Sequence, residues 1–223
     1  MKWLMSLFLV LALFVATSVT NAAIEIALEA ELASILKAPM VVGDDEPDTS
    51  NNQYIWAAGA PATGGGGAGW AEFVVNIPQP GKYALWGRVI AWDGNSDSFW
   101  VTWQPSDPDE DPQVTQNVEF RWGVAQTAAW RWDRINHWLD GGTFDREWEF
   151  DQAGETVLRI GVREDATKLD TIFVTDNVKA VDEASANVRL PDDRDREKQQ
   201  EKLAVNPQNK AATTWGKLKQ FYR

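Results

Sequence analysis

Glu29 and Glu31 are the pair of residues whose types and spacing most directly suggest chemistry. Side chains two positions apart in an extended strand point to the same face of a sheet, so these carboxylates would lie side by side and repel each other. A hard cation between them relieves the repulsion, and carboxylate oxygens suit calcium. Asp170 is a plausible third ligand, because the first and last strands of a sandwich are often neighbours. The alternative is a solvated acidic strand face.

Tryptophan is the second residue type that stands out, with 13 in the chain and only Trp3 and Trp215 outside the region from 24 to 178. Tryptophans inside predicted strands are expected to pack in a core; these are Trp86, Trp100, Trp132 and Trp148. Others lie in or beside loops, where an uncovered indole is costly; these are Trp56, Trp92, Trp122 and Trp130. A sugar ring covers an indole well, so the loop tryptophans are candidates for ligand contact.

A catalytic site is the less favoured interpretation. Paired carboxylates are typical of glycosidases, in which one acid is protonated and the other ionised. Nothing in the sequence singles out such a pair among the many acidic residues, which include Asp93, Asp97, Asp133 and Glu164. The one histidine, His137, has no cysteine partner and no nucleophile motif. We therefore expect a protein that is not an enzyme.

The segments that must position these residues read as strands. Apolar and polar residues alternate, with Gly, Pro, Asn or Asp between the runs, and helical periodicity is absent. This predicts an all-β fold, an antiparallel β-sandwich of the jelly-roll type, with strands at Glu25–Glu31, Trp70–Ile77, Lys82–Ile90, Asp97–Trp103, Arg131–Trp138, Asp145–Phe150, Glu155–Val162 and Leu169–Thr175.

Two long polar loops interrupt the strand pattern, Val42–Gly69 and Gln104–Thr127. Long loops at the rim of a rigid sandwich are commonly functional, so they are the first candidates for the ligand face. The glycine run Gly64–Gly67 lacks the Lys and Ser or Thr that follow in a phosphate-binding loop, which favours a flexible spacer over nucleotide binding.

The two ends of the chain differ from the region between them. Residues 1–23 carry Lys2 and an apolar run from Leu4 to Ala16, which predicts a secretory signal peptide cleaved near Ala22 or Ala23 and hence a secreted or extracellular protein without a transmembrane segment. The chain has no cysteine, so no disulfide framework is expected. Residues 24–178 would form the sandwich.

The two regions after residue 23 differ in charge. Residues 24–178 hold 10 Lys or Arg against 26 Asp or Glu, and so acidic a surface disfavours nucleic acid as a partner. Residues 179–223 would form a charged linker and a basic C-terminal tail, partly helical or disordered. Trp215, Leu218 and Phe221 keep near-helical spacing in that tail, so docking on a surface protein is one interpretation and plain disorder the other.

Short motifs in a fixed order resemble the carbohydrate-binding modules of families 6 and 35, which are calcium-containing, galactose-binding-like β-sandwiches. The motifs are Leu28-Glu29-Ala30-Glu31, Gly69-Trp70-Ala71-Glu72-Phe73, Pro80-Gly81-Lys82-Tyr83-Ala84-Leu85-Trp86-Gly87-Arg88-Val89, Ser96-Asp97-Ser98-Phe99-Trp100-Val101, Trp130-Arg131-Trp132-Asp133, Ala153-Gly154-Glu155-Thr156-Val157-Leu158, and the run from Gly161 to Ile172. The resemblance covers about Ile24 to Asn177.

The resemblance implies that Glu29, Glu31 and Asp170 hold a structural calcium ion. It also implies a cleft at the loop rim in which Tyr54 or Trp56 and Trp130 enclose a sugar, with Trp132 as a buried partner. Lys168 stands where the family commonly has an asparagine, and a lysine there could donate to hydroxyls or favour a uronic acid.

Three hypotheses follow from the sequence. The first is a secreted, non-catalytic module that binds a polysaccharide through its loop aromatics, Tyr54, Trp56, Trp92 and Trp130, with Lys168. The second is a structural or adhesion module that docks on a surface partner through its C-terminal tail. The third, and least favoured, is a small glycoside-active enzyme.

Overall fold

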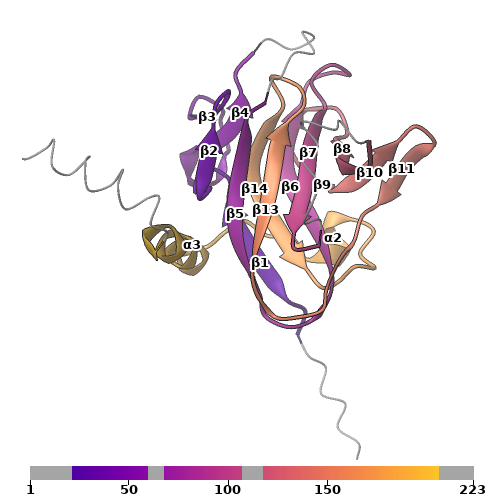
Figure 1. Ribbon diagram of the computed structural model, residues 1–223. Helices are drawn as coiled ribbons and strands as arrows, with labels where there is room; N and C mark the ends of the chain where they lie inside the picture. The colour runs from indigo at the N-terminus through magenta and orange to yellow at the C-terminus, as the bar shows by residue number, and fades with distance from the viewer. Residues whose placement is uncertain (1–21, 60–67, 107–117, 206–223) are drawn as a thin grey trace, which may run out of the picture.

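The computed structural model describes residues 22–59, 68–106 and 118–205. These residues form two antiparallel sheets packed face to face, which confirms the predicted β-sandwich (Figure 1). Three predicted features lie outside the described residues. They are most of the signal peptide, in residues 1–21, the glycine run Gly64–Gly67 and the basic end from residue 206.

The first sheet runs in the order β12-β6-β14-β4-β3, with β1 paired to β14 and β9 paired to β6. Its strands are β1 (Glu25–Glu29), β3 (Met40–Gly43), β4 (Tyr54–Ala57), β6 (Gly81–Ala91), β9 (Thr127–Arg134), β12 (Trp148–Phe150) and β14 (Lys168–Thr175). The first and last predicted strands are thus neighbours, as expected, with Glu29 opposite Thr171.

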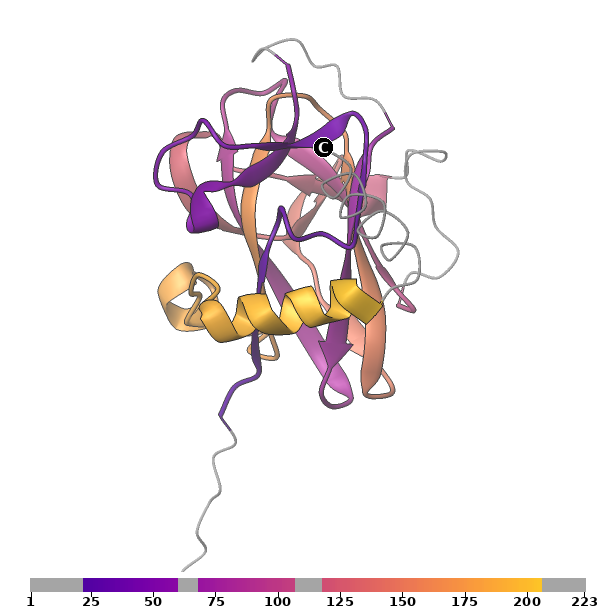
Figure 2. The ribbon, with the colours of Figure 1, turned by 90° about the vertical axis from the view of Figure 1, so that its left-hand side faces the viewer.

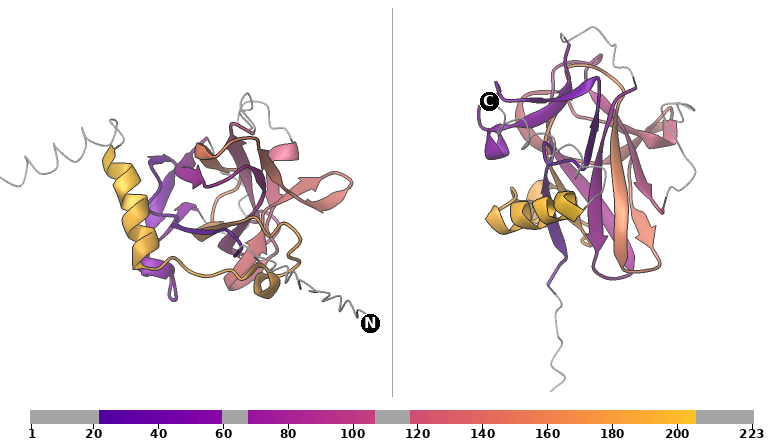
Figure 3. Two further views of the ribbon diagram at one scale, coloured as in Figure 1. Left: turned by 90° about the horizontal axis from the view of Figure 1, so that it is seen from below. Right: turned by 60° about the vertical axis from the view of Figure 1, so that its left-hand side comes forward.

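The second sheet runs in the order β2-β5-β13-β7-β8. Its strands are β2 (Ile35–Lys37), β5 (Trp70–Ile77), β7 (Ser98–Gln104), β8 (Arg121–Gly123) and β13 (Gly154–Val162). A separate hairpin, β10 (Asn136–Leu139) and β11 (Gly142–Asp145), projects from the side of the sandwich opposite α3 (Figures 1 and 3).

Alternating burial explains why these segments are strands. In β5, Ala71, Phe73, Val75 and Ile77 are buried and the residues between them are more exposed, so every second side chain enters the core between the sheets. Every residue of β14 is buried instead, because this strand lies inside the sheet and is covered on both faces.

The segment after residue 178 provides part of that second cover, over Phe173. Ala180, Ala186 and Val188 pack against Trp86 and Phe173 on the outer face of the first sheet. This stretch contains the short helix α2 (Glu183–Ala186). A longer helix, α3 (Asp193–Val205), then crosses beside β1 (Figure 2). The predicted linker is therefore partly helical, and its first part contributes to a small apolar cluster.

Three predicted strands depart from the observed ones by more than one residue at an end. The first strand ends at Glu29 and not at Glu31, while the predicted strands Arg131–Trp138 and Asp145–Phe150 are each divided, giving β9 and β10, and β11 and β12. The loop predicted at Val42–Gly69 is wrong in its first half, which holds the end of β3, the 3-10 helix η1 (Ser50–Asn52) and β4. The second loop likewise contains the 3-10 helix η2 (Val118–Phe120) and β8.

Candidate functional site

Two groups of side chains lie at the same end of the first sheet. We call Tyr54, Trp56, Trp92, Trp130 and Lys168 the aromatic cluster. We call Glu29, Glu31 and Asp170 the acidic cluster.

Strand register brings the aromatic cluster together. Lys168, the first residue of β14, lies opposite Trp56 of β4 on one side and Ile90 of β6 on the other. Trp92 follows directly after β6, and Trp130 lies in β9, which pairs with β6. Four segments far apart in sequence thus meet at one sheet end.

Lys168 is the centre of this cluster. Its Nζ atom lies 4.8 Å from the ring centroid of Tyr54, 5.1 Å from that of Trp56 and 5.7 Å from that of Trp92. These are cation–π distances. The ammonium group also forms an ion pair with Glu46, and both side chains are largely buried. The lysine is therefore held by one carboxylate and three rings.

Exposure separates the four aromatic residues. Trp92 is 38% exposed, Trp56 and Trp130 are partly exposed, and Tyr54 is fully buried. The hydroxyl of Tyr54 donates to Asp45 Oδ1 at 2.6 Å, and burial together with this acceptor raises the pKa of the phenol. Tyr54 also packs against both Trp56 and Trp130, with ring centroids 6.0 Å and 5.8 Å apart. Tyr54 therefore supports the exposed rings from beneath.

Consecutive residues of one loop fasten the cluster. Asp45 accepts from Tyr54, Glu46 pairs with Lys168, and the Pro47 carbonyl accepts from Trp130 Nε1 at 2.9 Å. The Asp48 carbonyl accepts from Arg88 Nη1 at 2.9 Å. This loop fixes two of the four rings by hydrogen bonds.

The acidic cluster lies at the other end of the same loop. Ser50 donates through its backbone N–H to Asp170 Oδ1 at 2.9 Å and through its hydroxyl to Glu29 Oε1 at 2.8 Å. Asn51 donates to Glu31 Oε1 at 2.8 Å. Asp170 sits at a register shift between β14 and β6, where the regular pairing is interrupted. Short-range contacts through one loop therefore join the two clusters.

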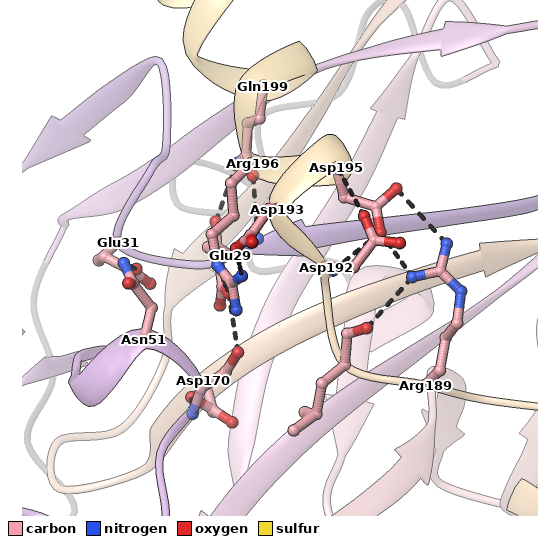
Figure 4. Close-up of polar contacts among 12 residues, drawn as sticks. Glu29, Glu31, Asn51, Asp170, Arg189, Asp192, Asp193, Asp195, Arg196 and Gln199 are labelled. Carbon is pink, nitrogen blue, oxygen red and sulfur yellow. Dashed lines mark hydrogen bonds and ion pairs between the residues drawn. The ribbon is translucent and has the colours of Figure 1, made fainter.

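Two arginines face the three carboxylates. Arg88 Nη1 lies 2.5 Å from Asp170 Oδ2, and the guanidinium of the same residue stacks on Trp130, 5.5 Å from its ring centroid. Arg196 Nε, from α3, donates to Glu29 Oε1 at 2.9 Å. Figure 4 shows Arg196 and Gln199 reaching from α3 to Glu29, with Glu31 and Asp170 beside it.

Burial dominates the electrostatics of these acids. It raises the pKa of Glu31 to about 7 and that of Asp170 to about 6, and it raises the pKa of Glu29 as well. The neighbouring carboxylates contribute in the same direction, because each disfavours the charge on the others. The three acids are close enough to interact, but Glu31 lies in the turn after β1 and does not share a strand face with Glu29, although the sequence argument assumed that it does.

The donor set fits a cation in part. Glu29 Oε2 and Glu31 Oε2 are buried and have no hydrogen-bond partner, and two such oxygens are hard ligands that suit calcium. Both oxygens of Asp170 are engaged, by Ser50 and by Arg88. Accordingly, within the described residues no three acidic, histidine or cysteine side chains converge to hold a metal ion. A cation at this site would be held by Glu29 and Glu31. Asp170 could become a third ligand only if Arg88 moved away from its carboxylate.

The remaining tryptophans are mostly core, as predicted for those in strands. Trp86, Trp100 and Trp148 are buried, and the partly buried Trp132 packs against Phe173. Trp122 was a candidate for ligand contact, and that prediction is wrong, since the residue is fully buried in β8 and donates to Asp133 Oδ2 at 2.8 Å.

The acids weighed for catalysis have structural partners. Glu164 Oε2 accepts from the Asp97 N–H at 2.9 Å and from the Ser98 hydroxyl at 2.6 Å. Asp97 and Asp133 line a cavity of about 290 Å³ beside the β10–β11 hairpin. His137 lies in that hairpin opposite Phe144.

Sequence reasoning missed four residues that hold the two clusters. They are Glu46, Arg196 and Gln199, which carry no motif, and Arg88, which lies in one of the resembling motifs but has no role assigned by it. The available signal was the excess of acid at Glu29, Glu31 and Asp170, which calls for positive charge nearby but does not identify the partner.

Comparison with known proteins gives similar folds and no close relative. No family model matches the chain, and no curated protein matches it. A family 35 carbohydrate-binding module from Clostridium thermocellum superposes with a TM-score of 0.49 and 18% identity, over 68% of this chain and 98% of that one. The described domain is similar in structure to such modules.

Two further structures are similar to a somewhat lesser extent. The module CBM6cm-2 of Cellvibrio mixtus lichenase 5A, solved with cellotriose, has a TM-score of 0.44 and 14% identity, over 66% of this chain and 94% of that one. CBM35 from Paenibacillus barcinonensis has a TM-score of 0.45 and 14% identity, over 66% and 96%. These modules are of the two families that the sequence motifs resemble.

One finding concerns membranes. In the part of the chain that the structure describes, no helix has the length and apolar composition needed to cross a bilayer.

Proposed function

We propose that this protein is a secreted, non-catalytic carbohydrate-binding module whose ligand stacks on the exposed rings of the aromatic cluster. One observation carries the proposal. Trp56 and Trp92 present partly exposed indoles around the Lys168–Glu46 pair, and the partly exposed Trp130 packs on Tyr54 beside them, at one end of a rigid sheet. Exposed indoles gathered around buried polar groups are what a sugar site requires.

The chemistry of the cluster matches that of a sugar ring. The C–H face of a pyranose packs on an indole and covers apolar surface, while its hydroxyls need donors and acceptors at the edge of the ring. Lys168 supplies a donor and Glu46 an acceptor, and both are fixed before the ligand arrives. A site prepared in this way has less side-chain entropy to lose on binding.

We further propose that the ligand is a neutral glycan. The charge of Lys168 is already matched by Glu46, and Asp45 lies on the same loop. A uronic acid would bring a carboxylate toward these two acids and gain little from a lysine that is already paired. Lys168 and Glu46 together suit hydroxyl groups better than carboxylates.

A glycan panel tests the proposal. Calorimetric titration should give binding to at least one neutral polysaccharide, and Trp92→Ala should weaken it about 10- to 100-fold, as expected when roughly 1–3 kcal/mol of stacking is lost. Phe144→Ala is the matched control, since Phe144 is a 52% exposed aromatic residue on the β10–β11 hairpin. Binding that is absent for every glycan, or equally weakened by both substitutions, would refute the proposal. Release of reducing sugar from the panel would instead favour an enzyme.

We also propose a structural calcium ion, held by the free oxygens of Glu29 and Glu31. Calcium added to the chelator-treated protein should raise its melting temperature, because a ligand that binds only the folded state stabilises it. Glu31→Gln keeps an acceptor for Asn51 but removes the charge, and should abolish the effect. Glu149→Gln, on an exposed acid of β12, should leave it unchanged. An equal calcium response in both variants would exclude Glu31 as a ligand.

Docking through the C-terminal tail gains no support from the described residues, because residues 206–223 lie outside them.

A further inference from the structure

Helix α3 is attached to the sandwich mainly through polar contacts at Glu29. Gln199, which is 8% exposed, accepts from the Glu29 N–H at 2.9 Å and donates to the carbonyls of Glu29 and Leu32 at 2.9 and 3.0 Å. Arg196 donates to the side chain of the same glutamate. One residue of β1 therefore receives both the backbone and the charge contacts of the helix.

The rest of the helix interface is loosely packed. The sequence of α3, from Asp193 to Leu203, is almost entirely charged or amide-bearing and has no apolar face to bury. A cavity of about 500 Å³ remains between the helix and the edge formed by β1 and β5. Docking of α3 thus depends on its contacts with Glu29 and on surface ion pairs, which contribute little by themselves.

The charges of the acidic cluster balance only in certain combinations. Arg88 pairs with Asp170 and Arg196 pairs with Glu29, whereas Glu31 accepts a hydrogen bond from the uncharged Asn51. When all three acids are ionised, one negative charge is therefore unmatched. A divalent cation added to both arginines would leave one positive charge. A divalent cation that replaces one arginine leaves no net charge. This arrangement has the least uncompensated charge in a buried site.

Arg196 is the easier of the two to displace. Arg88 lies in the central strand β6, where it is held by Asp170 and the Asp48 carbonyl and stacks on Trp130. Arg196 lies on a loosely packed helix and is 25% exposed at its side chain, against 15% for Arg88.

We propose that the guanidinium of Arg196 and a divalent cation compete for the Glu29 carboxylate, so that cation binding at Glu29 and Glu31 releases α3 from β1. The inference rests on the proposed calcium site. It assigns α3 the role of an internal counterion in the absence of the metal.

Calcium titration of the full chain tests the competition. Arg196→Gln should bind calcium at least about tenfold more tightly than the unsubstituted chain, because the competing charge is gone. Arg194→Gln, on an exposed arginine of the same helix, should bind like the unsubstituted chain. Arg196→Lys keeps the positive charge, so its calcium affinity should stay close to that of the unsubstituted chain. This variant separates the effect of the charge from any loss of helix packing.

Hydrogen exchange supplies the second readout. Calcium should speed amide exchange in residues 193–203 of the unsubstituted chain, and magnesium serves as a second probe. Unchanged or weaker calcium binding by Arg196→Gln, or slower exchange in α3 with calcium, would overturn the competition. If no variant binds calcium, both the competition and the proposed calcium site are refuted. Glycan binding is measured separately in the presence of chelator, so it tests the proposed function independently.

Discussion

At the scale of single residues, two largely buried cations organise the site. Lys168 joins Glu46 to three aromatic rings, and Arg88 joins Asp170 and the Asp48 carbonyl to Trp130. Each cation is surrounded by one carboxylate and by ring faces, which together offset the cost of removing it from water. Arg88 contacts both clusters, so a change at the acidic cluster has a direct route to Trp130.

Asp133 allows a prediction about pH at this scale. Burial raises the pKa of its carboxyl, although Trp122 donates a hydrogen bond to it. Because the pKa in the folded state lies above that in the unfolded state, the stability linked to this group is greatest in acid and is lost as pH rises through the folded-state pKa. Asp133→Asn keeps an acceptor for Trp122 and removes the charge.

The Asp133→Asn variant should therefore be more stable than the unsubstituted chain at pH 7, and its advantage should disappear near pH 3. Urea denaturation at the two pH values measures the difference. A variant that is less stable at pH 7 would show that the charge itself is needed.

The sequence identified many residues of the site by their type, but it did not identify the residues that pair with them. The three acids could be selected from the sequence by their charge and spacing, whereas Lys168 was selected only because it stands where the resembling family commonly has an asparagine. Glu46 and Arg196 could not, since each is an ordinary surface residue until the fold brings it to its partner. Tyr54 could be placed in the cluster, but only the structure shows that its ring is buried beneath the indoles.

At the scale of secondary structure, period-two alternation predicted the long strands well. β5 has the predicted bounds, β13 differs from prediction by one residue at its start, and β6 and β7 each differ by one residue at both ends. Short strands were missed, because β3, β4 and β8 hold only three or four residues each, too few for alternation to stand out from a loop. β4 matters most, because it carries Tyr54 and Trp56.

Helix α3 gives a prediction at the same scale. Gln199→Ala removes two hydrogen bonds to Glu29 at the end of β1 and one to Leu32 in the turn after it, and leaves the Glu29 N–H and two carbonyls without this partner. We expect a loss of about 1–3 kcal/mol in the docking of α3, the usual cost of unsatisfied buried groups. Faster amide exchange in residues 193–203 would measure it.

The adjacent Gln200 is exposed and provides the matched control. Gln200→Ala should leave exchange in α3 unchanged. If both substitutions have the same effect, helix propensity and not docking explains it.

At the scale of the whole molecule, the chain carries a formal net charge of −12. A field of this sign repels anionic polymers and has no effect on uncharged ones. Neutral sugars and divalent cations are therefore the ligands that the molecule as a whole admits most readily. The composition alone was enough to disfavour nucleic acid, but the choice between neutral and acidic sugars required the Lys168–Glu46 pair.

Salt should separate these two ligand classes. If the ligand is neutral, its affinity should change by less than about twofold between about 50 and about 500 mM NaCl, because screening acts only on charged pairs. Calorimetry at the two salt concentrations measures this. An affinity that falls steeply with salt would indicate an acidic glycan.

The most direct measurement follows the assigned indole N–H resonances during titration with a glycan selected from the panel. The proposed site predicts shifts for Trp56, Trp92 and Trp130, with the fully buried Trp103 and Trp122 unchanged. Shifts confined to tryptophans outside the aromatic cluster, such as Trp138 in the β10–β11 hairpin, would contradict the assignment of the binding surface.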